Sequence, residues 1–122
     1  MPASAKLKGS ATLRNNANVE GGKDIDRLDR YPNNTASWTF TADGAIPSAE
    51  ITVSASGVSR YLDIYLDDVR IVRNLLFNST DFTHPITKSA GKFNISAGNH
   101  KLTVANGDSN WEAIVAYVSI KG

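Results

Sequence analysis

The sequence contains no cysteine. This excludes a disulfide-stapled scaffold, a thiol nucleophile and a metal site built from thiolates. The sequence also lacks runs of like charge, and its 13 basic and 12 acidic side chains leave a formal net charge of +1. Because nucleic acids and anionic membranes are recognised by concentrated positive charge, neither is expected as a partner.

Long apolar runs are missing as well. The longest, residues 113–118, is far too short to cross a bilayer. The first ten residues, MPASAKLKGS, lack the apolar centre of a secretion signal, so no signal peptide is expected in this chain. With 122 residues, the sequence suits a single domain, 1–122, that buries its own core.

What the chain does contain is apolar and polar alternation with period two, in segments rich in β-branched and aromatic residues. The alternation predicts these inward-facing sets: Ala49, Ile51, Val53 and Ala55; Trp38 and Phe40; Leu62, Ile64 and Leu66; Leu102 and Val104; Ile114, Ala116, Val118 and Ile120. Turns with glycine separate the segments, and no helical period persists. The sequence therefore predicts an all-β fold, an antiparallel β-sandwich or jelly roll of about eight to nine strands.

Some segments between these strands are read as turns and loops. Asp67 and Asp68 form the expected tip of a hairpin. The polar stretches 15–24 and 29–37 are expected to be long loops, where binding residues usually gather on a rigid sandwich. Segment 73–80 fits either a strand or a loop.

Catalytic patterns are scarce. His84 and His100 do not have the spacing of metal ligands, and the chain contains neither a G-x-S-x-G nucleophile motif nor a glycine-rich phosphate loop. Asp24 and Asp26 could share one face of a strand, which is expected to be a solvated, charge-balanced surface. A small glycan-acting enzyme using Asp24, Asp26 and Asp108 is the least favoured hypothesis, because no insertion is long enough to cover a cleft.

Two aromatic residues in expected loops are more informative. Tyr31 lies in DRYPNN and Trp111 in DSNWEA, each beside Asp and Asn. A pyranose ring has an apolar C–H face and a rim of hydroxyls, so a sugar site needs a flat ring next to amide and carboxylate groups. The residues alone leave two interpretations of Trp111 open, a lid on the core or a platform for a ligand. Trp38 is expected in the core.

The order of these segments resembles the carbohydrate-binding modules of families 6 and 35, within the galactose-binding-like superfamily. The resemblance rests on the loop that contains GGKD, the hairpin YLDIYLDDVRI and the end GKFNISAGNHKLTVANGDSNWEAIVAYVSI, and it extends from about residue 11 to residue 120. It implies a β-jelly roll that binds a polysaccharide without catalysis, in a cleft formed by loops at one end of the sandwich.

The chain departs from this family pattern at two places. Many members have Asn and Asp where this chain has Ile114 and Ala116. Asp108 and Asn110 are the expected replacements from the preceding loop. Members also often hold a structural calcium through a glutamate in the first strand, but the corresponding stretch here, AKLKGSA, has no acidic residue. No cofactor is required, and the resemblance leaves a structural calcium without that ligand.

The leading hypothesis is therefore an extracellular sugar-binding module, whose secretion signal was removed or belongs to a longer parent that includes a glycan-active enzyme. The expected carbohydrate-binding residues are Tyr31, Trp111, Asn110, Asp108, Asp26 and Asn33. The alternative is a structural or adhesive β-sandwich without a small ligand, which would pack or pair with neighbours through its strand edges.

Overall fold

The computed structural model describes residues 5–106 and 112–122, and within them the chain forms ten strands. The strands are β1 (Lys6–Lys8), β2 (Thr12–Asn15), β3 (Lys23–Asp26), β4 (Thr35–Ala42), β5 (Ile46–Ser56), β6 (Arg60–Leu66), β7 (Val69–Phe77), β8 (Ile86–Ile95), β9 (Gly98–Ala105) and β10 (Ile114–Lys121). The all-β prediction is confirmed, with more strands than expected. Strands β1 to β3 have only three or four residues each, too few for a period of two to stand out.

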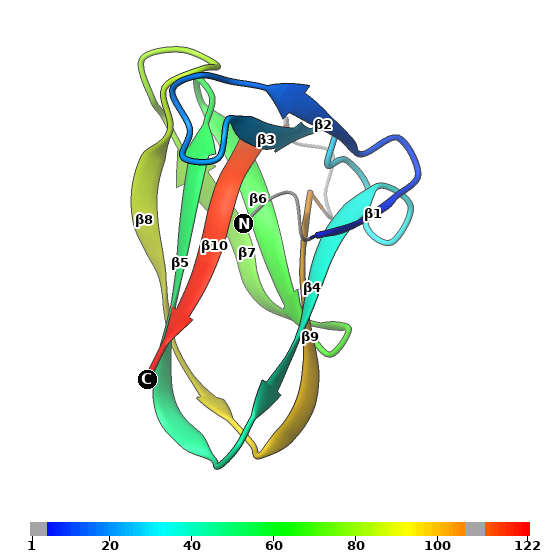
Figure 1. The fold of residues 1–122 in the computed structure, drawn as a ribbon, viewed down its shortest axis with the longest axis vertical. Coiled ribbons are helices and arrows are strands. Elements are labelled where there is room, and N and C mark those ends of the chain that lie inside the picture. The colour runs from blue at the N-terminus through cyan, green and yellow to red at the C-terminus, as the bar shows by residue number, and fades with distance from the viewer. Residues whose placement is uncertain (1–4, 107–111) are drawn as a thin grey trace.

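The strands form two five-stranded antiparallel sheets that face each other (Figure 1). One sheet has the order β1-β4-β9-β6-β7 and the other the order β2-β3-β10-β5-β8. The apolar faces of both sheets meet in one core, whose largest fully buried side chains include Phe77, Ile25, Leu28 and Ile51. The expected antiparallel sandwich is therefore the observed architecture. The described residues include no helix that is long and apolar enough to span a membrane.

Strand β5 shows the expected alternation most clearly. Ala49, Ile51, Val53 and Ala55 are all fully buried, as the period of two predicts. The neighbouring strand β10 differs, because its pairing with β5 shifts between Val115 and Tyr117. Such a β-bulge inserts one residue and reverses the phase of the alternation.

Because of this bulge, the set of inward-facing residues predicted for β10 was partly wrong. Val115, Val118 and Ile120 pair with the inward-facing residues of β5 and pack in the core. Ile114 and Ala116, which the sequence placed on the same face as Val118 and Ile120, are therefore out of phase with them. The period of two predicted the strand correctly but not the irregularity within it.

The hairpin of β6 and β7 turns at Asp67 and Asp68, as predicted. Both residues have positive φ, 51° and 67°, which suits the type I′ turns that match the twist of two-residue hairpins. The uncertain segment 73–80 proves to be the end of β7 up to the fully buried Phe77, followed by a loop.

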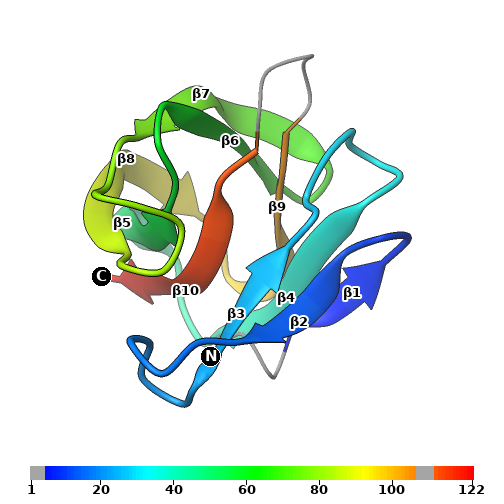
Figure 2. The same ribbon diagram turned by 90° about the horizontal axis from the view of Figure 1, so that it is seen from above.

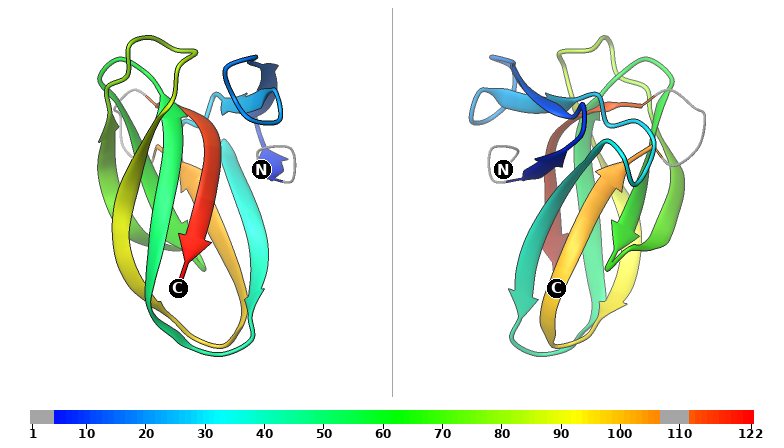
Figure 3. Two further views of the ribbon diagram at one scale, coloured as in Figure 1. Left: turned by 60° about the vertical axis from the view of Figure 1, so that its left-hand side comes forward. Right: turned by 90° about the vertical axis from the view of Figure 1, so that its right-hand side faces the viewer.

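The short strands β1, β2 and β3 lie at the upper end of the molecule as drawn in Figure 1, and the turns β4–β5 and β8–β9 lie at the opposite end. Strand β1 pairs with β4 only at residues 35–37, and β3 pairs with β10 only at Val115. The lower halves of β4 and β10 therefore have no strand partner on the side where the two sheets open (Figure 3).

Candidate functional site

Loop 27–34 and the end of β9 meet at the upper end of the sandwich (Figure 2). Asn106 is fully buried there and is the last described residue before segment 107–111. Its N–H donates to the carbonyl of Leu28 at 2.7 Å, and its carbonyl accepts from the N–H of Tyr31 at 3.2 Å. The chain therefore enters segment 107–111 directly beside Tyr31.

Three of the predicted site residues, Asp108, Asn110 and Trp111, lie outside the described residues. The two predicted interpretations of Trp111, lid or platform, thus stay predictions.

Tyr31 lies on the outer face of the sheet that contains β6. Its ring stacks on Tyr65, with ring centroids 3.7 Å apart and an interplanar angle of 10°. Its hydroxyl donates to Asp68 Oδ1 at 2.9 Å. Burial, with a smaller contribution from the Asp68 carboxylate, raises the pKa of Tyr31 to about 12. The phenol is therefore a neutral donor at physiological pH, held at both its ring and its hydroxyl.

Loop 27–34 is also tied to the turn between β1 and β2. Asn34 accepts from the N–H of Ser10 at 2.7 Å and donates to Asp29 Oδ1 at 2.6 Å. Gly9 has φ of +68°, and a Cβ at this position would lie 2.2 Å from the carbonyl oxygen of Asn33. Only glycine allows this close approach, so contacts with the turn between β1 and β2 help to fix the path of the loop beside Tyr31.

The other two described candidates are less engaged. Asn33 is exposed, and its N–H donates to the carbonyl of Arg30 at 2.7 Å. Asp26, at the end of β3, is half-buried and accepts from the N–H of Arg27 at 2.8 Å. Asp26 forms no hydrogen bond with Tyr31 or Asn33 among the described residues, and the side chains of Asp26 and Asn33 keep hydrogen-bonding capacity for other groups.

Asp24 is not on a solvated face, and that expectation was wrong. It is 1% exposed and forms two hydrogen bonds with Arg14, from Nε at 3.0 Å and from Nη2 at 2.8 Å. Asn16 Nδ2 donates to the same carboxylate at 2.9 Å. The donors also bond the carbonyls of Phe82 and Thr83, so this cluster joins β2 and β3 to the loop after β7. Asp24 is thus a buried structural group, because its neighbours satisfy it completely.

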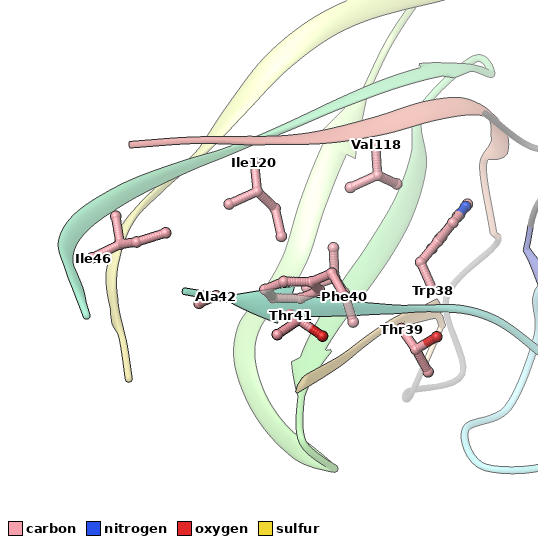
Figure 4. A pocket seen from close by; sticks show the side chains of 9 residues that line it. Trp38, Thr39, Phe40, Thr41, Ala42, Ile46, Val118 and Ile120 are labelled. Carbon is pink, nitrogen blue, oxygen red and sulfur yellow. The ribbon is translucent and has the colours of Figure 1, made fainter. Parts of the chain in front are cut away.

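A second feature is the open side of the sandwich, where the apolar faces of β4 and β10 form a groove of about 420 Å³. Val118 and Ile120 point from β10 toward Trp38 and Phe40 on β4, while Thr39 and Thr41 point away (Figure 4). Trp38 and Phe40 are only half-buried. They pack against the core, as predicted, but they also line this groove because neither β1 nor β3 covers it.

His100 is engaged in a structural contact with the tip of the β6–β7 hairpin. Its Nδ1 lies 2.6 Å from Asp67 Oδ2, and its Nε2 lies 2.7 Å from the carbonyl of Ser96. Both ring nitrogens face acceptors, which favours the doubly protonated ring. The hydrogen bond with Asp67 raises the pKa of His100 above 6.5 and lowers the pKa of Asp67 below 3.8.

This pair predicts a pH dependence of stability. A raised histidine pKa gives stability that is fully present below the unfolded value of 6.5 and is lost as the pH rises through the folded pKa. The lowered pKa of Asp67 gives stability that is lost as the pH falls through its folded value. The melting temperature of the wild type should therefore exceed that of His100→Gln most at mildly acidic pH, and the difference should shrink toward pH 9 in calorimetric scans. A constant difference across that range would contradict the ion pair.

The described residues include no group of three or more His, Asp or Glu side chains that could hold a metal ion. In the first strand, where the family pattern has a glutamate, the side chains are Lys6, Leu7 and Lys8. In place of that carboxylate, the first strand therefore presents ammonium groups, which repel a cation.

Sequence analysis missed Tyr65 and Lys101. Tyr65 is 5% exposed and supports Tyr31, while Lys101 Nζ lies 2.9 Å from Asp68 Oδ1. Both positions alternate out of phase with the core residues of their strands, which was the available signal. The contacts of Tyr65 and Lys101 near Tyr31 could not be predicted from the sequence, because they depend on loop 27–34 folding over the outer face of the sheet.

No family sequence model matches the chain, and no curated protein matches it by sequence. Solved structures do match. A family 35 carbohydrate-binding module from Clostridium thermocellum superposes with a TM-score of 0.84 at 16% identity, over 98% of this chain and 93% of that one. A CBM35 structure from Paenibacillus barcinonensis gives a TM-score of 0.80 at 12% identity, over 99% and 94%.

The same likeness extends to parts of larger enzymes. An exo-β-1,3-galactanase from Phanerochaete chrysosporium, solved with β-1,3-galactotriose, matches with a TM-score of 0.79 at 20% identity. The match covers 98% of this chain but only 28% of the galactanase chain. In its fold, the protein is therefore a β-sandwich like the family 35 carbohydrate-binding modules.

Proposed function

We propose that the protein is a non-catalytic carbohydrate-binding module whose ligand lies across the loops at the upper end of the sandwich. One observation carries this proposal. Tyr31, in the stretch DRYPNN that the sequence selects for its aromatic residue, donates its N–H to the carbonyl of Asn106, which directly precedes the segment that contains Trp111. The fold shared with carbohydrate-binding modules supports the same function.

The proposed chemistry divides between aromatic and polar groups. Trp111 supplies a flat ring for the C–H face of a sugar, and Tyr31 supplies a second aromatic surface whose orientation Tyr65 fixes. The proposed hydrogen-bond partners of the sugar hydroxyls are Asp108, Asn110, Asn33 and Asp26. A ring that is already immobilised loses little entropy on binding, which favours the complex.

A catalytic role is not proposed. A glycosidase needs two carboxyl groups free to act on the scissile bond, and Asp24 is committed to Arg14 and Asn16. Matches to enzymes such as a Podospora anserina GH26-CBM35 mannanase support attachment of this module to a glycan-active enzyme, which would place it outside the cell. The ligand is then an extracellular glycan.

The test is glycan binding by a Trp111→Ala variant. Loss of one stacked ring should weaken binding by about 1–1.5 kcal/mol, roughly tenfold, with nearly the same melting temperature as the wild type. Binding is measured by isothermal titration calorimetry with the strongest hit of a glycan array. Tyr117→Ala is the matched control. Tyr117 lies on β10, in the sheet that does not contain β6 and Tyr65, and its hydroxyl is hydrogen-bonded to Thr87.

A large fall in melting temperature for Trp111→Ala, with unchanged affinity after correction for unfolded protein, would make Trp111 part of the core and remove the proposed platform. An array without any hit, together with a defined oligomer in light scattering, would favour the structural or adhesive alternative.

A further inference from the structure

A polar pocket of about 240 Å³ adjoins the proposed sugar site at Tyr31, on the outer face of strands β1, β4 and β9. Its wall includes Lys6, Lys8, Lys101, Thr103, Tyr31 and Asp68. The pairing explains this grouping, because Lys6 pairs with Ser37, Ser37 with Thr103 and Thr103 with Tyr65 in one row across the strands. Cross-strand partners lie on the same face of a sheet, so the chemistry of the pocket is placed by rigid strands.

The charges in this pocket are unbalanced. Lys101 Nζ is paired with Asp68 Oδ1 at 2.9 Å. Lys6 and Lys8, two residues apart on β1, have no ion-pair partner among the described residues. Three ammonium groups therefore face one carboxylate, and the pocket carries an excess of positive charge.

One residue that lines the pocket, Thr103, carries a hydroxyl without a partner. Thr103 is 3% exposed, and its Oγ1 is buried with no hydrogen bond, the one such side-chain atom found in the described part of the chain. An unsatisfied buried polar group costs free energy, so such groups usually have a ligand or water as partner. This hydroxyl keeps an unused donor, and its residue lines the pocket.

We propose that this pocket binds a tetrahedral oxyanion, the sulfate ester of a glycan. Its ammonium groups are separate single-point donors on two strands, and no arginine is among the residues that line it. Such donors suit an anion whose oxygens point in several directions, whereas a planar carboxylate is matched best by the guanidinium fork of arginine. The volume of about 240 Å³ lies below the roughly 300–1,000 Å³ typical of whole-ligand sites, so the pocket holds one substituent rather than a sugar chain.

Asp68 sets the strength of this site. Hydrogen bonds from Lys101 and Tyr31, and the charges of Lys101 and Lys8, lower the pKa of Asp68, so it is ionised at neutral pH. Its charge opposes an incoming anion and engages Lys101. Substitution by Asn keeps an acceptor for the Tyr31 hydroxyl but removes the charge, so Asp68→Asn should bind the oxyanion more tightly.

The inference rests on the proposed function, because the sulfate is carried by a saccharide. The experiment uses pairs of galactan oligosaccharides with and without one sulfate ester, and inorganic sulfate alone, titrated into the full chain by calorimetry and by NMR. The double variant Lys6→Met/Lys8→Met should weaken binding of the sulfated sugar about tenfold or more. Lys92→Met, on β8 in the other sheet, is the control.

Thr103→Val is the variant that separates binding from folding. Because it removes an unsatisfied buried hydroxyl, its melting temperature should equal or exceed that of the wild type, while its affinity for the sulfated sugar should fall. Asp68→Asn should bind the sulfated sugar more tightly than the wild type, and this gain in affinity would also support the site.

Equal binding of sulfated and unsulfated sugars by the wild type, unchanged in the lysine double variant, would overturn this inference and leave the proposed function intact. If inorganic sulfate bound as tightly as the sulfated sugar, the saccharide would contribute nothing to affinity. This result would overturn the assignment of the anion to a glycan. Preference for a carboxylated over a sulfated sugar would overturn the oxyanion assignment.

Discussion

Replacement of Asp24 by alanine should lower the free energy of unfolding by about 3 kcal/mol, at the lower end of the range for breaking a buried ion pair. Asp24 is 1% exposed, whereas the Arg14 side chain is 31% exposed and can be partly rehydrated. The substitution also leaves Asn16, which is 6% exposed, without its carboxylate partner. For a domain of this size the melting temperature should fall by about 10 °C in calorimetry.

Asp26→Ala is the matched control for this experiment. Asp26 lies two residues away on the same strand, but it accepts a hydrogen bond from the N–H of the adjacent Arg27. Its substitution should change stability by less than about 1 kcal/mol. If Asp24→Ala were as mild as Asp26→Ala, the cluster around Arg14 would not hold β2 and β3 to the loop after β7, and Asp24 would again be available for function.

The second large effect is expected at Asp63, a carboxylate in the middle of β6 that is fully buried. It accepts the N–H of Asn74 at 2.7 Å and lies 3.3 Å from Arg70 Nη1. The pairing of β6 and β7 is irregular here, and Asn74 has φ of +54°. The carboxylate thus accepts a backbone N–H at the point where the pairing of the two strands is irregular.

Asp63→Ala should therefore cost about 3 kcal/mol, since it removes from a fully buried position the acceptor of the Asn74 N–H and the carboxylate beside Arg70. Asp63→Asn keeps an oxygen that can accept from Asn74, so it should lose less, and urea unfolding curves of the two variants give the difference. Equal losses in both variants would show that the charge toward Arg70, rather than the bond to the bulge, is what matters.

The structure shows which acidic residues are buried and which are exposed, a difference that the sequence pattern does not predict. Asp24, Asp26 and Asp63 all sit at polar positions of alternating strands, where solvent exposure is the expected outcome. Asp26 is half-exposed, but Asp24 and Asp63 are covered by Arg14, Asn16 and the β7 bulge. Each covering group comes from another strand or loop, so the local pattern contains no information about it.

The site shows the same division. Tyr31 and Trp111 were recognised as aromatic residues beside Asp and Asn, and the structure bonds Tyr31 to Asn106, the last described residue before segment 107–111. The lysine pocket was not foreseen, because Lys6, Lys8 and Lys101 are far apart in the chain and no run of like charge connects them.

The sequence by itself determined the all-β class, the core faces of β4, β5, β6 and β9 and the Asp67-Asp68 hairpin, because period-two alternation and turn residues act over a few neighbouring positions. Only the tertiary structure decided the phase of β10 after its bulge, the burial of Asp24 and Asp63, and the grouping of Tyr31, Tyr65 and the three lysines on one sheet face. These features depend on strand pairing between distant segments, whose register no single segment encodes.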